Sequence, residues 1–82
     1  DEMFNLGKEI FLNNGNCATC HSLKYADAVA NVGPNLNEIR PDIGRVINSV
    51  TNGIGVMPAM LGILTDKEIK AVAYYVSEAS MN

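Results

Sequence analysis

Apolar residues recur at helical spacing in three segments of the chain, and loops rich in glycine, proline and asparagine separate these segments. The first segment runs from about residue 2 to 13, the second begins near Pro41 and closes at Asn52-Gly53, and the third begins at Thr65. The apolar stripes comprise Met3, Gly7, Ile10 and Phe11 in the first segment, Ile43, Val46, Ile47 and Val50 in the second, and Ile69, Val72, Ala73 and Val76 in the third. No alternating run predicts a sheet, so we expect an all-α chain of three main helices.

Local residues predict where these helices begin and end. Asn14-Gly15 would end the first helix, because glycine tolerates the left-handed conformation of a helix C-terminus. Pro41 is favoured in the first turn of the second helix. Thr65-Asp66-Lys67-Glu68 predicts a capping box at the start of the third helix, with Leu64 and Ile69 as the accompanying hydrophobic staple.

Gly7 is placed inside the first predicted helix, where glycine costs up to ~1 kcal/mol relative to alanine. A glycine at such a position often permits a close approach by another backbone or a large side chain. Tyr74 or Tyr75 of the last helix is the natural candidate to fill the notch, and a tolerated surface glycine is the alternative.

Cys17-Ala18-Thr19-Cys20-His21 is the segment that points most directly to chemistry. Two thiols three positions apart, followed at once by the only histidine, are typical of a covalent c-type haem site. Two thiolates one helical turn apart can add to the two vinyl groups on one porphyrin edge. His21 can then turn its imidazole under the iron as an axial ligand.

Three other uses of this thiol pair fit the sequence less well. A structural disulfide with a two-residue spacer closes a loop too short to gain much entropy. A thioredoxin-like redox pair needs a βαβ setting, which the pattern does not predict. Zinc needs four ligands, and the chain offers Cys17, Cys20 and His21 with no second cluster.

A haem iron held by His21 needs a second axial ligand, and the candidates are methionines because no second histidine exists. Met3 and Met81 lie near the termini on predicted helices, where they are more suited to filling gaps in packing. Met57 and Met60 remain. Met57 is favoured, because Pro58 fixes its own backbone and restricts Met57, which suits a loop pinned in one extended conformation. Met60 would be a plain apolar contact beside the porphyrin.

The 82 residues are predicted to form one domain, residues 1–82. A chain this short usually needs stabilisation beyond its hydrophobic core, and a covalently held haem would provide it. The net charge of −3 disfavours nucleic acid as a partner. No transmembrane helix is predicted, since asparagines, glycines and a proline interrupt the uncharged run 46–65. No basic and apolar leader opens the sequence, so any export signal is expected to have been removed already.

The ligand pair His21 and Met57 would decide the function. Thioether ligation raises the reduction potential and fills the last axial position, which leaves one-electron transfer as the chemistry. Two other classes stay open. One is a haem sensor or peroxidase-like protein in which Met57 is absent from the iron or leaves it readily. The other is a haem-free redox or metal module.

At this point the chain resembles a small bacterial class I cytochrome c. The matching residues occur in the family's order over nearly the whole chain; they are Gly7, Phe11, Cys17 to His21, Gly33-Pro34-Asn35-Leu36, Met57-Pro58, Val72 and Tyr75. The resemblance implies the cytochrome c fold, with the first and last helices crossing and three main helices wrapped around one haem c. It also implies that the Pro34 carbonyl accepts a hydrogen bond from the His21 ring, and that Leu36 packs against the porphyrin.

The family further implies an electron carrier, not an enzyme, that is exported to the periplasm. It would accept electrons from a periplasmic donor, a dehydrogenase or a complex, and pass them to a respiratory acceptor. The family also includes tightly bound haem subunits of dehydrogenases, such as those oxidising sulfite, and the oligomeric state stays open. The chain departs from several branches in having no Trp, which helps to hold a haem propionate there. Arg40, Arg45, Asn48 and Asn52 could take that role here or be solvated surface.

Charged residues are absent from two stretches, residues 10–23 (with His21 counted as a ligand) and 46–65. These stretches should surround the exposed haem edge, so we expect redox partner proteins to dock on a mostly apolar face. The expected contact residues are Ala18, Val56, Ala59 and Met60. The alternative is that these residues merely cover the haem.

Overall fold

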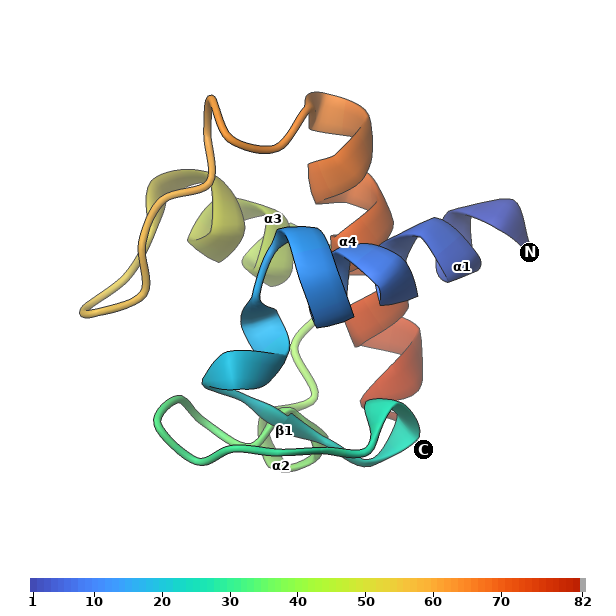
Figure 1. Ribbon diagram of the computed structural model, residues 1–82, viewed down its shortest axis with the longest axis vertical. Helices are drawn as coiled ribbons and strands as arrows, with labels where there is room; N and C mark the ends of the chain where they lie inside the picture. The colour runs from blue at the N-terminus through green and yellow to red at the C-terminus, as the bar shows by residue number, and fades with distance from the viewer. Residues whose placement is uncertain (82) are drawn as a thin grey trace.

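The computed structural model describes residues 1–81 and shows a mostly helical chain (Figure 1). Four α-helices are present among these residues: α1 (Glu2–Glu9), α2 (Leu36–Ile39), α3 (Ile43–Asn52) and α4 (Asp66–Ala79). A π-helical segment (Ile10–Asn14) continues α1, and two short 3₁₀ turns follow at Cys17–Thr19 and Lys24–Ala26. Strands β1 (Ser22–Leu23) and β2 (Ala28–Val29) pair antiparallel, with Ser22 opposite Val29. No helix in this part of the chain is long and apolar enough to cross a membrane.

Helices α1 and α4 cross at Gly7, as the family resemblance implied (Figure 1). A β-carbon at Gly7 would overlap the carbonyl oxygen of Ala71 and stand 2.5 Å from the β-carbon of Tyr75. The notch is therefore filled by the α4 backbone and by Tyr75. Tyr74 points elsewhere, and its hydroxyl donates to Oδ2 of Asp1 at 2.8 Å.

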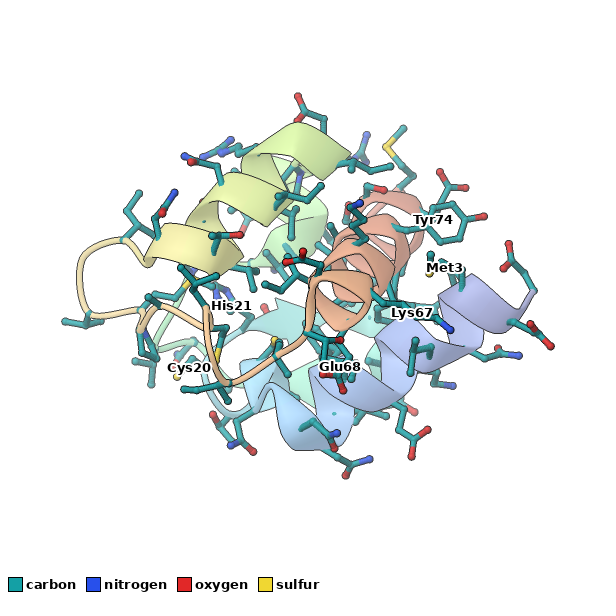
Figure 2. All side chains as sticks on the ribbon, turned by 90° about the horizontal axis from the view of Figure 1, so that it is seen from above. Met3, Cys20, His21, Lys67, Glu68 and Tyr74 are labelled. Atoms are coloured by element: carbon teal, nitrogen blue, oxygen red, sulfur yellow. The ribbon has the colours of Figure 1, made fainter. Side chains whose placement is uncertain are left out.

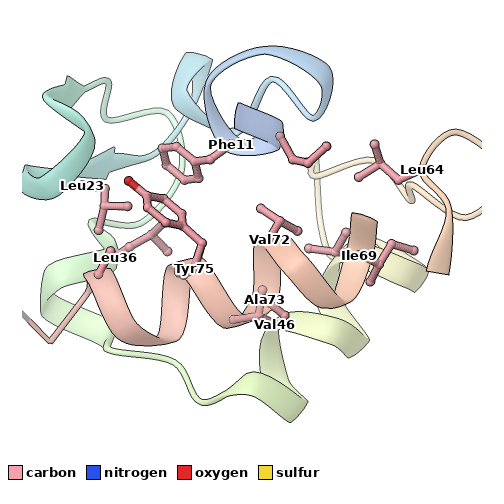
Figure 3. Packing of buried hydrophobic residues seen from close by; sticks show 13 residues of the cluster. Phe11, Leu23, Leu36, Val46, Leu64, Ile69, Val72, Ala73 and Tyr75 are labelled. Atoms are coloured by element: carbon pink, nitrogen blue, oxygen red, sulfur yellow. The ribbon is translucent and has the colours of Figure 1, made fainter. Parts of the chain in front are cut away.

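The hydrophobic core lies between α4 and the segments that surround it (Figure 3). The predicted α4 stripe is buried along its length, from Ile69 to Val76. Phe11, Val72 and Tyr75 are 0% exposed, and the rings of Phe11 and Tyr75 lie 5.8 Å apart. Phe4 packs edge-on against Tyr75 at 4.9 Å. An aromatic cluster thus fixes the angle at which the two terminal helices cross.

The start of α4 agrees with the sequence prediction. The Glu68 backbone N–H donates to Oγ1 of Thr65 at 3.1 Å, and the Thr65 backbone N–H donates to Oε1 of Glu68 at 2.8 Å. Leu64 and Ile69, the predicted staple, are both buried in the core cluster. Each partner of this box satisfies a backbone N–H that would otherwise be unpaired.

The end of the first helix differs from the prediction. Regular α-helix ends at Glu9, and a π-turn follows in which the Gly15 N–H donates to the Ile10 carbonyl at 2.7 Å. Gly15 is right-handed, with φ of −89°, and Asn16 takes the left-handed conformation, with φ of 54°. Glycine was expected at that position because it lacks Cβ, but asparagine also tolerates the left-handed region.

Further differences concern the middle of the chain. Pro41 is buried but precedes the second main helix, because the Asp42 carboxylate takes the cap position and accepts from the Arg45 N–H at 2.8 Å. The small sheet and α2 were not predicted, since elements of two and four residues carry no periodic pattern. Met3 and Ile43 belong to the predicted apolar stripes, and they are the partly exposed members at 36% and 42%.

Candidate functional site

A cavity of about 440 Å³ lies between the Cys17–Thr19 turn, α3, α4 and the loop 53–65. Its inner wall is apolar; the buried residues that line it include Phe11, Leu36, Val46, Leu64, Val72 and Val76. This volume and lining are typical of sites for organic cofactors. Every site residue predicted from the sequence lines this one cavity: Cys17, Cys20, His21, Pro34, Leu36 and Met57.

The local backbone brings both thiols and the imidazole to the cavity wall. Asn16 turns the chain in the left-handed conformation, and a 3₁₀ turn follows in which the Cys20 N–H donates to the Cys17 carbonyl at 3.1 Å. The His21 N–H donates to the same carbonyl at 2.9 Å. Both cysteines are unpaired and half-buried, and Figure 2 shows Cys20 and His21 on the same side of the molecule.

The thiol of Cys17 lies in an unreactive environment. Burial raises its pKa to about 11, and Cys20 adds to the shift electrostatically. A thioredoxin-like nucleophile needs the opposite, a lowered pKa that supplies thiolate at neutral pH. The zinc alternative is also disfavoured, because no group of three metal-binding side chains comes together in residues 1–81. Haem attachment is the remaining use of the motif, and the apolar cavity beside both thiols suits a porphyrin.

The imidazole of His21 is held by its neighbours. Its Nδ1 lies 2.8 Å from the Pro34 carbonyl oxygen, the contact that the resemblance implied. A carbonyl oxygen can only accept, so Nδ1 carries a proton, and the neutral ring then presents the lone pair of Nε2. The Gly33 N–H donates to the Cys20 carbonyl at 2.7 Å, which ties the Gly33-Pro34 segment to the motif. His21 is thus preset to offer Nε2 to a metal.

Gly33 leaves room for that ring. A β-carbon at Gly33 would lie 2.7 Å from Cε1 and 2.9 Å from Nδ1 of His21. Sequence reasoning noted Gly33 as part of a matching motif but assigned it no contact. The only indication of this contact in the sequence was the position of Gly33 directly before Pro34, whose carbonyl orients the imidazole.

Both candidate methionines line the cavity from the loop 53–65. Met57 closes a tight turn with Ile54: the Met57 N–H donates to the Ile54 carbonyl at 2.9 Å, and the reverse bond is 3.1 Å. Gly53 packs beneath this turn with φ of 76°, and a β-carbon there would lie 2.8 Å from the Met57 carbonyl oxygen. Met60 is tied to α3, because its N–H donates to the Val50 carbonyl at 2.8 Å.

The rim of the cavity is apolar and exposed. Val32, Ile54 and Val56 line the cavity with exposed fractions of 71%, 66% and 93%. Of the contact residues expected from the sequence, Val56 and Ala59 are exposed, whereas Ala18 and Met60 are half-buried. Apart from the histidine, the only basic side chain lining the cavity in the described chain is Arg45, and no acidic side chain lines it.

A model of the family described as "Cytochrome C oxidase, cbb3-type, subunit III" matches residues 2–76. The chain belongs to the cytochrome c family. Cytochromes c with two cysteines in this arrangement carry one covalently bound c-type haem and transfer electrons, and the cytochrome c6 homologues are carriers rather than enzymes. The helical fold and the cofactor expected from the sequence are thereby confirmed.

Curated cytochromes c6 are similar to this cytochrome c along most of its length. The chain is 37% identical over 81 residues to cytochrome c6 of Synechocystis sp., a match that covers 85% of this chain. It spans 60% of the length of that relative. Cytochrome c6 of Diacronema lutheri is 36% identical over 75 residues, covering 85% of this chain and 88% of the relative.

A solved structure is more similar still. The c-type cytochrome SorU from Sinorhizobium meliloti superposes with a TM-score of 0.91 at 56% sequence identity. The superposition covers 96% of this cytochrome c and 92% of that chain. The crossing helices and the cavity described above therefore belong to a fold already solved for a c-type cytochrome.

Proposed function

We propose that the haem is thioether-linked to Cys17 and Cys20 and ligated by His21 Nε2 on one face and by the Met57 thioether on the other. One observation carries most of this proposal: both thiols, the imidazole and the Met57 side chain line one apolar cavity. The Nδ1 contact with Pro34 supports His21 as a ligand, because it fixes the tautomer in which Nε2 is unprotonated. Leu36 would pack against the porphyrin from the inner wall.

Met57 is preferred over Met60 as the axial ligand because its backbone is held more firmly in place. Met57 is set in a turn closed by two hydrogen bonds and backed by Gly53, which reduces the entropy lost when its thioether binds. This turn adds a source of rigidity to the restriction of Met57 that is expected from Pro58. Met60 is bonded to α3 and would remain an apolar contact at the cavity wall.

With both axial positions filled, a c-type haem supplies a one-electron couple with a potential raised by thioether ligation. The chain contributes three things to that couple. The Pro34 carbonyl holds the imidazole in one orientation, the apolar inner wall excludes water, and the paired turn of Met57 keeps the sixth position closed. A closed sixth position excludes oxygen and peroxide, which separates a carrier from a sensor or a peroxidase.

The proposed carrier works in the periplasm, where it accepts electrons from a dehydrogenase or complex and passes them to a respiratory acceptor. Redox partners would dock on the rim formed by Val32, Ile54 and Val56 and on the exposed Ala59 beside Pro58, where the haem edge would face solvent. This exposed apolar group, with no acidic side chain on it, suits a brief contact of modest area. A weak dependence of the electron-transfer rate on ionic strength follows, because apolar contacts are not screened by salt.

Two measurements on protein matured with a haem-attachment system test this function. The intact mass should exceed that of the polypeptide by one haem in the wild type and equal the polypeptide mass when Cys17 and Cys20 are both replaced by alanine. The reduced wild type should bind no carbon monoxide. Rapid binding of carbon monoxide would favour the sensor or peroxidase class, and an unmodified mass would favour the haem-free class.

A further inference from the structure

A second cavity, an open groove of about 310 Å³, lies between α1 and the first turn of α4. The residues that line it are Glu2, Met3 and Leu6 of α1 and Lys67 of α4. No residue lines both this groove and the haem cavity. Figure 2 shows Met3 and Lys67 on the side of the molecule away from Cys20 and His21. The groove is therefore a feature separate from the haem site.

The groove combines an apolar lining with one acid and one base. Met3 and Leu6 are three positions apart on α1, so they share a face of that helix, and neither is fully buried. The Glu2 carboxylate comes from α1 and the Lys67 ammonium from α4, so the two helices that bound the groove carry opposite charges. Neither charged side chain has an ion-pair partner among residues 1–81. Both charges are thus free to pair with another molecule.

Lys67 is placed against the preference of its own helix. The N-terminal end of a helix carries partial positive charge, which favours anionic side chains and disfavours cationic ones. The other charged residues in the first turn of α4, Asp66 and Glu68, follow this preference, and Lys67 stands between them. The stability of α4 therefore does not account for a lysine at this position, whereas an anionic group bound at the groove does.

A surface with an acid and a base flanking an apolar strip is complementary to itself. When a two-fold axis relates two copies of a chain, each contact of residue i with residue j is repeated as a contact of j with i. Glu2 of each copy can then meet Lys67 of the other copy, while the apolar side chains of the two grooves pack together. The net charge of −3 makes two copies repel each other in general. A face that carries one charge of each sign is a place where they can meet without that repulsion.

We propose that the groove binds a second copy of this chain in a weak, symmetric homodimer. Few residues line the groove, so the contact is small, and small contacts give transient complexes. The dimer leaves the apolar rim of each haem cavity open to redox partners, because the groove and that cavity share no residue. The inference does not depend on how the haem iron is ligated, and its test measures mass rather than electron transfer.

Sedimentation velocity of the matured holoprotein, measured up to millimolar concentration, tests the dimer. The wild type should change from monomer to dimer as its concentration rises. Glu2→Lys and Lys67→Glu should each weaken dimerisation about tenfold, because each replaces two attractive charge pairs across the axis with two repulsive ones. The matched controls are Glu9→Lys and Lys70→Glu, which make the same charge changes at exposed residues of α1 and α4 outside the groove. Each control should dimerise like the wild type.

A mixture of the two groove variants gives the sharpest result. In a dimer of one Glu2→Lys copy with one Lys67→Glu copy, each of the two contacts again joins an acid to a base. The mixture should therefore dimerise at least as tightly as the wild type, although each variant alone is impaired. Such recovery also shows that both variants are folded. A mixture of Glu9→Lys with Lys70→Glu has the same net charges and measures any gain from those charges alone.

Three results would overturn the proposal. They are a wild type that stays monomeric at millimolar concentration, groove variants that dimerise as well as their controls, and a mixture of groove variants that gains no more than the control mixture. Groove variants that exchange electrons more slowly with a redox partner, but dimerise like their controls, would assign the groove to that partner and would also contradict the homodimer.

Discussion

Gly33 lies so close to His21 that a β-carbon at residue 33 would stand 2.7 Å from Cε1 of the imidazole. The same segment supplies the Pro34 carbonyl that accepts from Nδ1. The residue that makes room for the ring and the residue that orients it are therefore adjacent. Any side chain at residue 33 must move the ring, the Gly33-Pro34 backbone, or both.

Gly33→Ala should displace the imidazole and weaken its hydrogen bond to Pro34. We expect a loss of about 1–3 kcal/mol in the free energy of unfolding, as for overpacked sites in general. The Nδ1 proton resonance of His21 in the reduced protein should also shift. Gly44→Ala is the control, because the nearest atom to a β-carbon there is Oδ1 of Asp42 at 3.5 Å. An unchanged resonance in Gly33→Ala would mean that the ring is not confined as described.

Gly7→Ala tests the crossing of α1 and α4. The added methyl would overlap the Ala71 carbonyl oxygen, and a backbone atom of a buried helix cannot swing away as a side-chain end can. We expect the helices to separate and the free energy of unfolding to fall by about 3 kcal/mol, the upper end for overpacking. Denaturant unfolding measures this loss. Equal stability of Gly7→Ala and Gly44→Ala would contradict the close approach.

Tyr75→Phe should stabilise the protein. The Tyr75 hydroxyl is buried and has no hydrogen-bond partner among the described residues, so it carries a desolvation cost without compensation. Removing it should add about 1 kcal/mol to the free energy of unfolding. Tyr74→Phe is the matched control, because it loses the bond to Asp1 and should lower stability by up to ~1 kcal/mol.

The same tyrosine should make the protein sensitive to alkali. Burial raises the pKa of Tyr75 to about 12, and Tyr25 adds to the shift electrostatically. An unfolded tyrosine loses its proton near pH 10, so the unfolded state releases a proton that the folded state keeps. The free energy of unfolding therefore has no loss from Tyr75 ionisation below pH 10, and it falls as the pH rises from 10 toward 12. Denaturant midpoints at pH 9 and 11 should therefore fall further in the wild type than in Tyr75→Phe; an equal fall would exclude Tyr75 as the cause.

Val56→Lys tests the docking face. Val56 is 93% exposed, so the substitution should change the free energy of unfolding by no more than about 0.5 kcal/mol. It places a charge on the apolar rim, which should slow electron exchange at an electrode coated with a methyl-terminated monolayer. Val29→Lys is the control, because Val29 is 88% exposed but does not line the cavity. Equal slowing by both variants would argue against a localised docking face.

Local residues were sufficient to predict the parts of the fold that depend on local chemistry. The Thr65–Glu68 box determines the start of α4 because both of its hydrogen bonds join residues three apart. The haem motif is equally local, since the spacing of Cys17, Cys20 and His21 sets their relation along one turn. The π-turn after Glu9 was not predicted, because no residue type in the segment 10–14 marks the change to hydrogen bonds that span five residues.

Where two residues of the same type were candidates for one role, only the three-dimensional structure could decide between them. Tyr74 and Tyr75 are adjacent, and only the rotation of α4 relative to α1 decides that Tyr75 faces Gly7. Arg40 and Arg45 are both plausible carboxylate binders by residue type, and only their placement shows that Arg45 alone of the two lines the cavity. Such selections depend on contacts between segments far apart in sequence, which no local pattern encodes.

The proposed ligation of the haem iron by His21 and Met57 underlies the electron-transfer function. The thioether charge-transfer band at the red end of the oxidised spectrum tests it most directly, measured on the wild type, Met57→Ala and Met60→Ala. The band should be present in the wild type, lost in Met57→Ala and kept in Met60→Ala. A band that survives in Met57→Ala, or is absent from the wild type, would contradict it.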